Sequence, residues 1–188
     1  VGERPNLPAQ PAPAVPTNGD FEVADEFDGP ALPPYWMMLR NPRETWFDLT
    51  SHPGALTLKA RRVGLGDNAN PSFLGRRQQH QDAEAQTVLR AAPAREGDRA
   101  GLAVLQSDDF WYALSAVRRA GAVVVELRRR AGPDQASAGE LLASRPLTGE
   151  GPIRFRIGGR GDAYDFAVAQ GDGDWSTILA NADGKLLS

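Results

Sequence analysis

The amino-acid sequence predicts an all-β fold, a two-sheet antiparallel β-sandwich, and two observations carry this prediction. Apolar residues recur with a period of two in several short segments, which is typical of strands with one buried and one wet face. Gly, Pro, Asn and Asp residues separate these segments and favour turns, and no long segment has helical periodicity. About ten to twelve short strands are expected from this pattern.

Four segments show the clearest alternation, and they define the expected inner faces of the two sheets. Successive side chains of a strand point to opposite sides, so residues two positions apart share a face. Glu126, Arg128, Arg154 and Arg156 are therefore expected on the wet faces of their strands. The residues expected to point inward are Leu56, Leu58, Ala60, Val123, Val125, Leu127, Ile153, Phe155, Ile157, Tyr164, Phe166 and Val168.

Two segments depart from this pattern. The first twenty residues contain five prolines, and proline fixes φ and removes a backbone donor, so residues 1–19 are expected to form an extended interdomain linker. The sandwich domain is then expected over residues 20–188. Segment 134–145 has the composition of a short helix, but its second half is interpreted as a strand.

Composition argues against several classes of function. The net charge of −3 does not favour a nucleic-acid partner, and the basic run 128–130 is interpreted as protection of a strand edge. The chain has no Cys, which excludes disulfides and thiolate chemistry. No apolar stretch is long enough to span a bilayer and no dinucleotide-binding motif is present, so neither a membrane nor a cofactor is expected. The compartment is left open.

Candidate catalytic groups are weak. Asp82 and Glu84 would share one face of a strand about 7 Å apart, and paired carboxylates perform glycoside hydrolysis. No apolar shell is evident around them, so they are interpreted as wet-face residues. His52 and His80 are the only histidines, too few for a zinc site, and no GxSxG motif is present. We therefore expect neither catalytic residues nor metal ligands in this chain.

Two further features bear on binding. Arg160-Gly161-Asp162 is an RGD tripeptide, but its place between two alternating segments favours a hairpin turn over an adhesion site. Trp111 lies between Phe110 and Tyr112, so it is expected on the outer face if its neighbours are in the core. An exposed aromatic residue there would contact a sugar or another domain.

Several motifs occur in a characteristic order. Segment 25–29 (DEFDG) precedes Trp36, segment 70–80 (NPSFLGRRQQH) follows, and segment 108–112 (DDFWY) comes before Trp175 and a final DG and LS. Together they resemble the C-terminal domain of glycoside hydrolase family 43 β-xylosidases and α-L-arabinofuranosidases. The resemblance runs from about residue 24 to the last residue.

This resemblance implies a concanavalin-A-like sandwich packed on a catalytic β-propeller of the same polypeptide. The propeller of the family carries the acid and base that release xylose or arabinose, and the sandwich carries neither. In some relatives a loop of the sandwich domain reaches the active-site mouth. Here that loop is expected at 64–73, with Phe73 as an apolar tip on a mobile segment, followed by Arg76, Arg77 and His80 at the domain interface.

Alternatives to a propeller-bound accessory domain remain open at this point. An independent carbohydrate-binding module for xylan or xylo-oligosaccharides is the second hypothesis, since the four Trp residues would allow it. Family members also continue past the leucine-serine motif. We therefore expect the sandwich to lack its last strand or strands, with an open edge and an irregular, poorly packed segment at 180–188.

Overall fold

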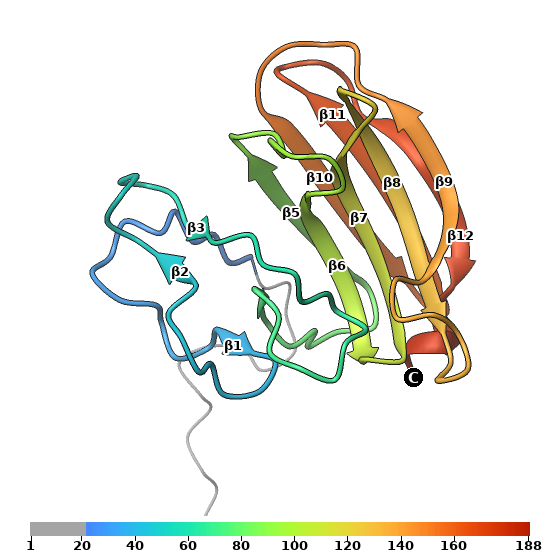
Figure 1. Cartoon of the computed structure of the whole chain (residues 1–188). Coiled ribbons are helices and arrows are strands. Elements are labelled where there is room, and N and C mark those ends of the chain that lie inside the picture. The colour runs from blue at the N-terminus through green and yellow to red at the C-terminus, as the bar shows by residue number, and fades with distance from the viewer. Residues whose placement is uncertain (1–21) are drawn as a thin grey trace, which may run out of the picture.

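The computed structural model describes residues 22–188, and its main body is the predicted two-sheet sandwich (Figure 1). Sheet I faces the reader in Figure 1 and follows the chain as a meander in the order β6-β7-β8-β9. Sheet II lies behind it in the order β12-β11-β10-β5. Its strands are β5 (Ala83–Leu89), β10 (Ile153–Arg160), β11 (Ala163–Gln170) and β12 (Ser176–Asp183); those of sheet I are β6 (Arg99–Ser107), β7 (Phe110–Arg119), β8 (Ala122–Ala131) and β9 (Glu140–Pro146).

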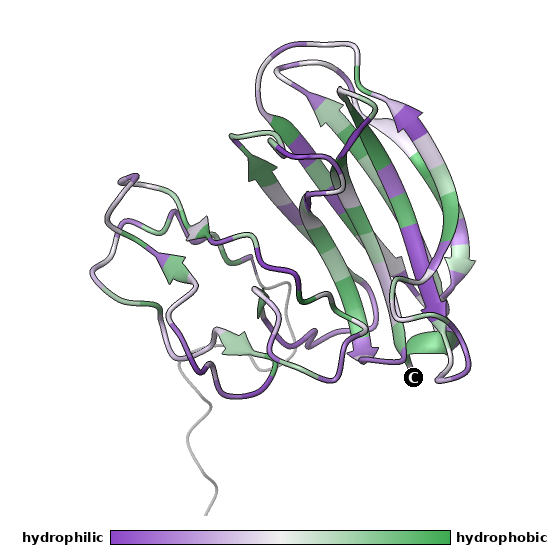
Figure 2. Ribbon diagram, in the orientation of Figure 1, coloured by the Kyte–Doolittle hydropathy of each residue, from purple (hydrophilic) through white to green (hydrophobic). Residues whose placement is uncertain are grey.

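The core lies between the two sheets and confirms most of the predicted inner faces. Antiparallel register places Phe155 of β10 opposite Val168 of β11, and Ile157 opposite Phe166, so apolar side chains stack on one face. Figure 2 shows the resulting alternation of hydrophobic and hydrophilic residues along the strands of the sandwich. The predicted inner residues that are buried are Val125, Leu127, Ile153, Phe155, Ile157, Tyr164, Phe166 and Val168, and Val123 packs against them.

The predicted wet faces have the expected orientation but are partly covered. Arg154 and Arg156 lie on the face of β10 opposite Phe155, where each guanidinium stacks on Trp175 at 5.1 and 4.5 Å from the ring centroid. Glu126 also lies on the outer face of sheet I, yet only 4% of it is exposed. Alternation therefore predicted the direction of these side chains correctly, but not their burial.

Residues 22–80 form an N-terminal lobe beside the sandwich (Figure 1). Its strands are only two residues long: β1 (Met37–Met38) pairs with β4 (Leu74–Gly75), and β2 (Phe47–Asp48) pairs with β3 (Thr57–Leu58). The inner-face prediction is wrong for this region, since Leu58 is 42% exposed, Ala60 is exposed and Leu56 is only half-buried. The reason is that this ribbon does not join either large sheet, so no second layer covers it.

The C-terminal segment also differs from the prediction. Strand β12 runs to Asp183, and a 3-10 helix, η1 (Gly184–Leu187), follows it. Leu186 and Leu187 pack against the core, and the Tyr112 hydroxyl donates to the Asp183 carbonyl at 3.0 Å. The sheet edges meet, because β5 contacts β6 and β9 contacts β12. Residues 180–188 are thus regular rather than irregular, and two of their leucines pack on the core. Strands β5, β6, β9 and β12 each hydrogen-bond to one neighbour only, so both sheets keep their edges, and the absence of a last strand stays a prediction.

Segment 134–145 follows the prediction in its second half, since residues 134–139 form turns and β9 begins at Glu140. The predicted linker at 1–19 lies outside the described residues. Within residues 22–188, no helix has the length and apolar character needed to cross a membrane.

Candidate functional site

The N-terminal lobe is organised around Asn70, the first residue of the NPSFLGRRQQH segment. Its amide oxygen accepts hydrogen bonds from Trp46 Nε1 at 2.9 Å and from Arg61 at 3.3 Å. Its amide nitrogen donates to the carbonyls of Leu39 at 2.7 Å and Arg40 at 3.3 Å. One side chain therefore links three stretches of a lobe that has little strand pairing of its own.

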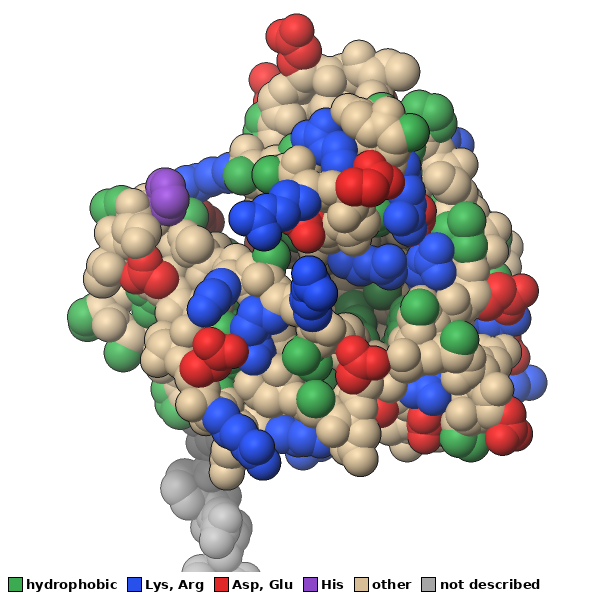
Figure 3. Space-filling model, viewed as in Figure 1, with side chains coloured by type: hydrophobic (Ala, Val, Ile, Leu, Met, Phe, Trp, Pro, Cys, Tyr) green, Lys and Arg blue, Asp and Glu red, His purple; other side chains and the backbone are tan. Residues whose placement is uncertain are grey.

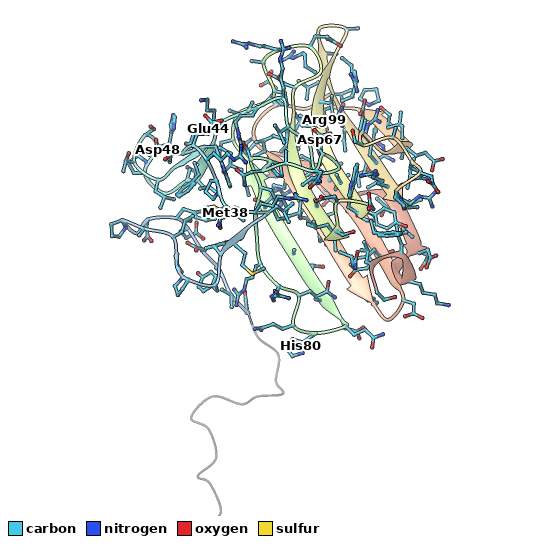
Figure 4. The ribbon with its side chains drawn as sticks, turned by 60° about the horizontal axis from the view of Figure 1, so that its bottom comes forward. Met38, Glu44, Asp48, Asp67, His80 and Arg99 are labelled. Atoms are coloured by element: carbon cyan, nitrogen blue, oxygen red, sulfur yellow. The ribbon has the colours of Figure 1, made fainter. Side chains whose placement is uncertain are left out.

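Arg61 extends this network toward the surface. It also donates to the Asn70 carbonyl at 2.6 Å and to the Ser72 hydroxyl at 3.0 Å, and it pairs with Glu44 at 3.1 Å. Arg61 and Lys59 together hold the pKa of Glu44 below its usual value. Figure 4 shows Glu44 and Asp48 at the side of the molecule away from His80. The hydrogen-bond network of Asn70 and Arg61 therefore lies on the side of the molecule away from His80, which ends the same sequence motif.

The segment at 64–73 is tied to the sandwich rather than projecting from it. Buried Arg130 of β8 donates to the Gly66 carbonyl at 2.9 Å, and Arg40 donates both to the Ala69 carbonyl at 2.7 Å and to the Asp108 carboxylate at 3.2 Å. Gly66 lies so close to Ser137 that a Cβ there would be 2.2 Å from its carbonyl oxygen. Polar contacts therefore hold this segment against the sandwich, while the mobility and the role expected for it stay predictions.

The predicted interface residues differ in burial and in the contacts that they make. Phe73 is half-buried, with its ring packed beside Gly75 of β4. Arg76 is exposed and stacks on the Tyr35 ring at 4.5 Å. Arg77 and His80 are exposed, and Figure 4 shows His80 at one extremity of the molecule.

Asp25 explains why the DEFDG motif and Trp36 belong together. Its carboxylate accepts hydrogen bonds from Trp36 Nε1 at 2.6 Å, the Tyr35 hydroxyl at 2.9 Å and the Phe27 amide at 2.9 Å. The bond from Trp36 is the main cause that lowers the pKa of Asp25 below its usual value. Asp25 thereby fixes the Tyr35 ring on which Arg76 stacks, and so presents that guanidinium in a defined place.

Trp111 corrects a prediction about exposure. It lies on the outer face of sheet I, opposite Tyr112, as alternation predicts, but only 3% of it is exposed. Its indole N–H donates to the Asp108 carbonyl at 3.0 Å, and Gly139 packs so closely that a Cβ would lie 2.6 Å from the ring. The chain's own turn before β9 therefore covers the ring, which leaves no open aromatic face there for a sugar.

Sequence reasoning missed an ion cluster on the same face. Glu126 is bound by Arg119 at 2.8 Å and by Arg128 at 2.9 Å. Burial acts to raise the pKa of Glu126, but the hydrogen bonds from the two arginines outweigh it and lower the pKa below its usual value. Figure 3 shows Lys and Arg side chains gathered around a hollow on this side of the molecule. The one feature of the sequence that could have indicated this cluster is that Glu126 is the single acidic residue of β8, a strand rich in arginine and apolar residues.

The weak catalytic candidates remain exposed. Asp82 accepts a hydrogen bond from the Gly161 amide at 2.8 Å, and Glu84 accepts one from Gln86 at 2.7 Å. Gly161 lies in the two-residue turn between β10 and β11 with φ of 55°, so the RGD tripeptide forms the predicted hairpin turn. His52 is exposed and contacts Thr57 at 3.2 Å. No group of three or more potential metal ligands occurs in the part of the chain that the structure describes.

The chain matches a known protein family. The model of the β-xylosidase C-terminal concanavalin A-like domain matches residues 24–188. Among characterised proteins, the non-reducing end α-L-arabinofuranosidase BoGH43B of Bacteroides ovatus is 36% identical over 107 residues, which cover 57% of this chain and 20% of that protein. A xylosidase/arabinosidase of Butyrivibrio fibrisolvens is 33% identical over 76 residues, which cover 40% of this chain and 15% of that protein.

Solved structures show the same fold. The family 43 protein B from the xyloglucan utilisation locus of Bacteroides ovatus superimposes with a TM-score of 0.78 at 26% identity, covering 93% of this chain and 34% of that one. The xylan β-1,4-xylosidase of Bacillus halodurans has a TM-score of 0.78 at 22% identity, covering 94% of this chain and 34% of that one. The matches thus cover between 15% and 34% of the length of these relatives.

Proposed function

The chain belongs to the family of β-xylosidase C-terminal concanavalin A-like domains, and we propose that it is a non-catalytic accessory domain of a family 43 glycoside hydrolase. Its parent would be of the xylosidase/arabinosidase type, as the names of the relatives suggest. The observation that carries the proposal is that the model of this C-terminal domain matches residues 24–188. The chain covers only a fraction of the length of its relatives, which are whole enzymes by their names. Catalysis would then belong to the other domain of the parent.

The acids of this chain support a non-catalytic role. A glycosidase needs two carboxyl groups on either side of a sugar, one of which has a raised pKa so that it can donate a proton. The described acids whose pKa is displaced, such as Asp25, Glu44 and Glu126, are all displaced downward, and each is bound to side chains of the lobe or of sheet I. Such carboxylates are held ionised, which does not suit a general acid.

The surface that we propose for docking on the catalytic domain is the β1–β4 ribbon and the residues after it. Met37 is 40% exposed on β1, where it pairs with Gly75, and Arg76 and Arg77 follow directly. An exposed apolar side chain beside two guanidinium groups is a composition common in protein interfaces. His80 ends the same segment, and Phe73 supports it from within the lobe.

The first experiment tests the absence of catalysis. The purified chain should release no 4-nitrophenol from 4-nitrophenyl β-xyloside or α-L-arabinofuranoside. Turnover that disappears when Asp82→Asn or Glu84→Gln is introduced would contradict the proposal, because it would place a working acid at the start of β5. Turnover that survives both changes would indicate a contaminating glycosidase.

The docking surface is tested in the full parent enzyme. Arg77→Glu should lower kcat/KM or loosen the domain contact, while Arg95→Glu, an exposed arginine in the loop before β6, serves as the matched control. Equal behaviour of the two variants would argue against this surface. Phe73→Ala should weaken the same contact, with some loss of stability because Phe73 is half-buried.

The second hypothesis, an independent module that binds xylan or xylo-oligosaccharides, has less support. Sugar rings stack on open aromatic faces, but Trp46 and Trp111 are 1% and 3% exposed and Trp175 carries two arginines. Affinity electrophoresis in xylan separates the two hypotheses. Retardation of the isolated chain relative to a gel without polysaccharide would favour the binding module.

A further inference from the structure

One end of the sandwich is open between the two sheets and holds a cavity of about 360 Å³. This is the end where β5, β7 and β11 finish and where β8 and β10 begin. Its floor consists of Leu89, Val123, Leu147 and Ile153, which all belong to the core or pack against it. The volume lies in the range of about 300–1,000 Å³ that is typical of small-molecule sites.

The polar groups around this cavity are hydrogen-bond donors. Arg90, Arg118 and Gln170 line it, and no Asp or Glu does. Arg118 is held in place because its Nε donates to the Pro93 carbonyl at 3.0 Å and its Nη1 to the Gly121 carbonyl at 2.9 Å. Both bonds are to neutral oxygens, so its positive charge has no carboxylate partner among residues 22–188.

Arg90 and Gln170 also have N–H groups that are free to donate hydrogen bonds. Arg90 is exposed, and its side chain forms no hydrogen bond or ion pair with any other residue of the range 22–188. Gln170 accepts the Gly149 amide with its Oε1 at 2.9 Å, which turns its Nε2 into the group available for a ligand. The cavity thus joins an apolar floor to a lining that includes two arginines and a glutamine.

We propose that this end cavity binds a small organic carboxylate that has an apolar body, such as an aromatic acid. The apolar body would cover the half-buried Leu89, Val123 and Leu147, and the carboxylate would accept charge-assisted hydrogen bonds from Arg118 and Arg90. The inference is independent of the proposed accessory role, because no residue of the β1–β4 ribbon lines the cavity and no partner domain is needed.

The test is a nuclear magnetic resonance titration of the ¹⁵N-labelled chain with trans-cinnamate. Saturable shifts are expected at the amides of Gly121, Gly149 and Gly151, which line the cavity. Cinnamyl alcohol lacks the charge and acetate lacks the apolar body, so each should bind at least about tenfold more weakly. Equal binding of the alcohol would reduce the effect to apolar adsorption and overturn the proposal, as would the absence of saturable shifts.

Variants complete the experiment. Arg118→Gln and Arg90→Gln should each weaken cinnamate binding by about tenfold, since hydrogen bonds to a charged group are among the strong ones. Arg95→Gln, an exposed arginine outside the lining, should bind like wild type. If Arg118→Gln disturbs the fold through its lost bonds to Pro93 and Gly121, Arg90→Gln decides the matter. The assignment would be refuted if Arg90→Gln bound cinnamate with wild-type affinity and a folded Arg118→Gln variant showed the same cinnamate-induced shifts as wild type.

Discussion

Replacement of Asn70 by Ala tests whether the lobe is held together by the side chain at its centre. Asn70 makes two short hydrogen bonds, with Trp46 Nε1 at 2.9 Å and the Leu39 carbonyl at 2.7 Å, and two longer ones at 3.3 Å. The Trp46 side chain is only 1% exposed, so its indole N–H would lose its acceptor where water has little access. The variant therefore leaves a buried donor unpaired.

The expected cost follows from these contacts. A stranded buried donor costs about 1–3 kcal/mol, and the loss of the bond to the partly buried Leu39 carbonyl adds ~1 kcal/mol. We expect Asn70→Ala to lower the free energy of unfolding by about 2–4 kcal/mol in total. That is a large fraction of the ~5–15 kcal/mol that holds a typical domain folded.

Urea denaturation measures this change, with far-UV circular dichroism for the sandwich and the ¹⁵N–¹H signal of the Trp46 indole for the lobe. With a slope of about 1–3 kcal/mol per molar urea, the midpoint should fall by at least ~0.7 M. If the lobe opens before the sandwich, the indole signal will show the loss first. A common fall of both signals and an earlier loss of the indole signal both agree with the structure, because both follow from the loss of the Asn70 amide.

Asn68→Ala is the matched control, since Asn68 is exposed and accepts a single bond from Arg40 at 2.9 Å. This change should cost no more than ~0.5–1 kcal/mol, as is usual for a bond at the surface. The reasoning fails if the two variants unfold at the same urea concentration by both probes. In that case the Asn70 network would contribute no more than an ordinary surface contact.

Three further changes test other parts of the structure. The pKa of Glu126 is lowered in the folded state, so the stability that it contributes is complete above its unfolded value of ~4.3 and is lost as the pH falls through the folded value. Glu126→Gln should cost about 1–3 kcal/mol at pH 7 and flatten the acid limb of the stability curve; unchanged unfolding at pH 7 and pH 3 would contradict this. Gly66→Ala places a Cβ 2.2 Å from the Ser137 carbonyl oxygen and should lower Tm by several degrees, which calorimetry measures. Tyr112→Phe removes the bond to the Asp183 carbonyl and should cost ~1 kcal/mol in urea unfolding; a neutral result would mean that η1 is held by its leucines alone.

The strands of the sandwich were predictable because their pattern has a direct physical cause. In β10, Ile153, Phe155 and Ile157 are at most 4% exposed while the arginines between them face outward. Two packed sheets bury one face of every strand, so a period of two in the sequence is enough to orient each side chain. The same argument placed Val125 and Leu127 correctly on β8.

The lobe was not predictable in this way. Segment 55–61 alternates as clearly as β10 does, yet Leu58 is 42% exposed because its strand pairs over two residues only. Local pattern reports a preference for one face, but a covering layer must be supplied by other parts of the chain. No feature of the sequence near Leu58 indicated that this layer would be absent.

The candidate site shows the same limit at longer range. The alternation of neighbouring residues predicted the side of the sheet on which Trp111 lies. Its burial depends on the turn before β9, where Gly139 packs on the ring, and Gly66, which Arg130 binds, packs on the same turn at Ser137. The hydrogen bond from Arg130 to Gly66 connects positions 64 residues apart. The resemblance of segment 70–80 to a known family located an important region, but the central role of Asn70 depends on its hydrogen bonds with Trp46 and Leu39, which lie 24 and 31 positions away in the sequence.

The strand order of the two sheets has a consequence for synthesis on the ribosome. Sheet I is a meander of neighbours, so each of its hairpins can form as soon as its second strand has emerged. Strand β5 is made before all of them, but Leu89 pairs with Ile153 of β10, and its strand must wait until that distant partner is synthesised. During this interval β5 has no backbone partner within the sandwich, and Val88 and Leu89 are apolar residues on an unpaired strand. Slow translation through β6–β9 would lengthen the period in which β5 can associate with another chain, so the yield of folded protein should depend on the speed at which that stretch is translated.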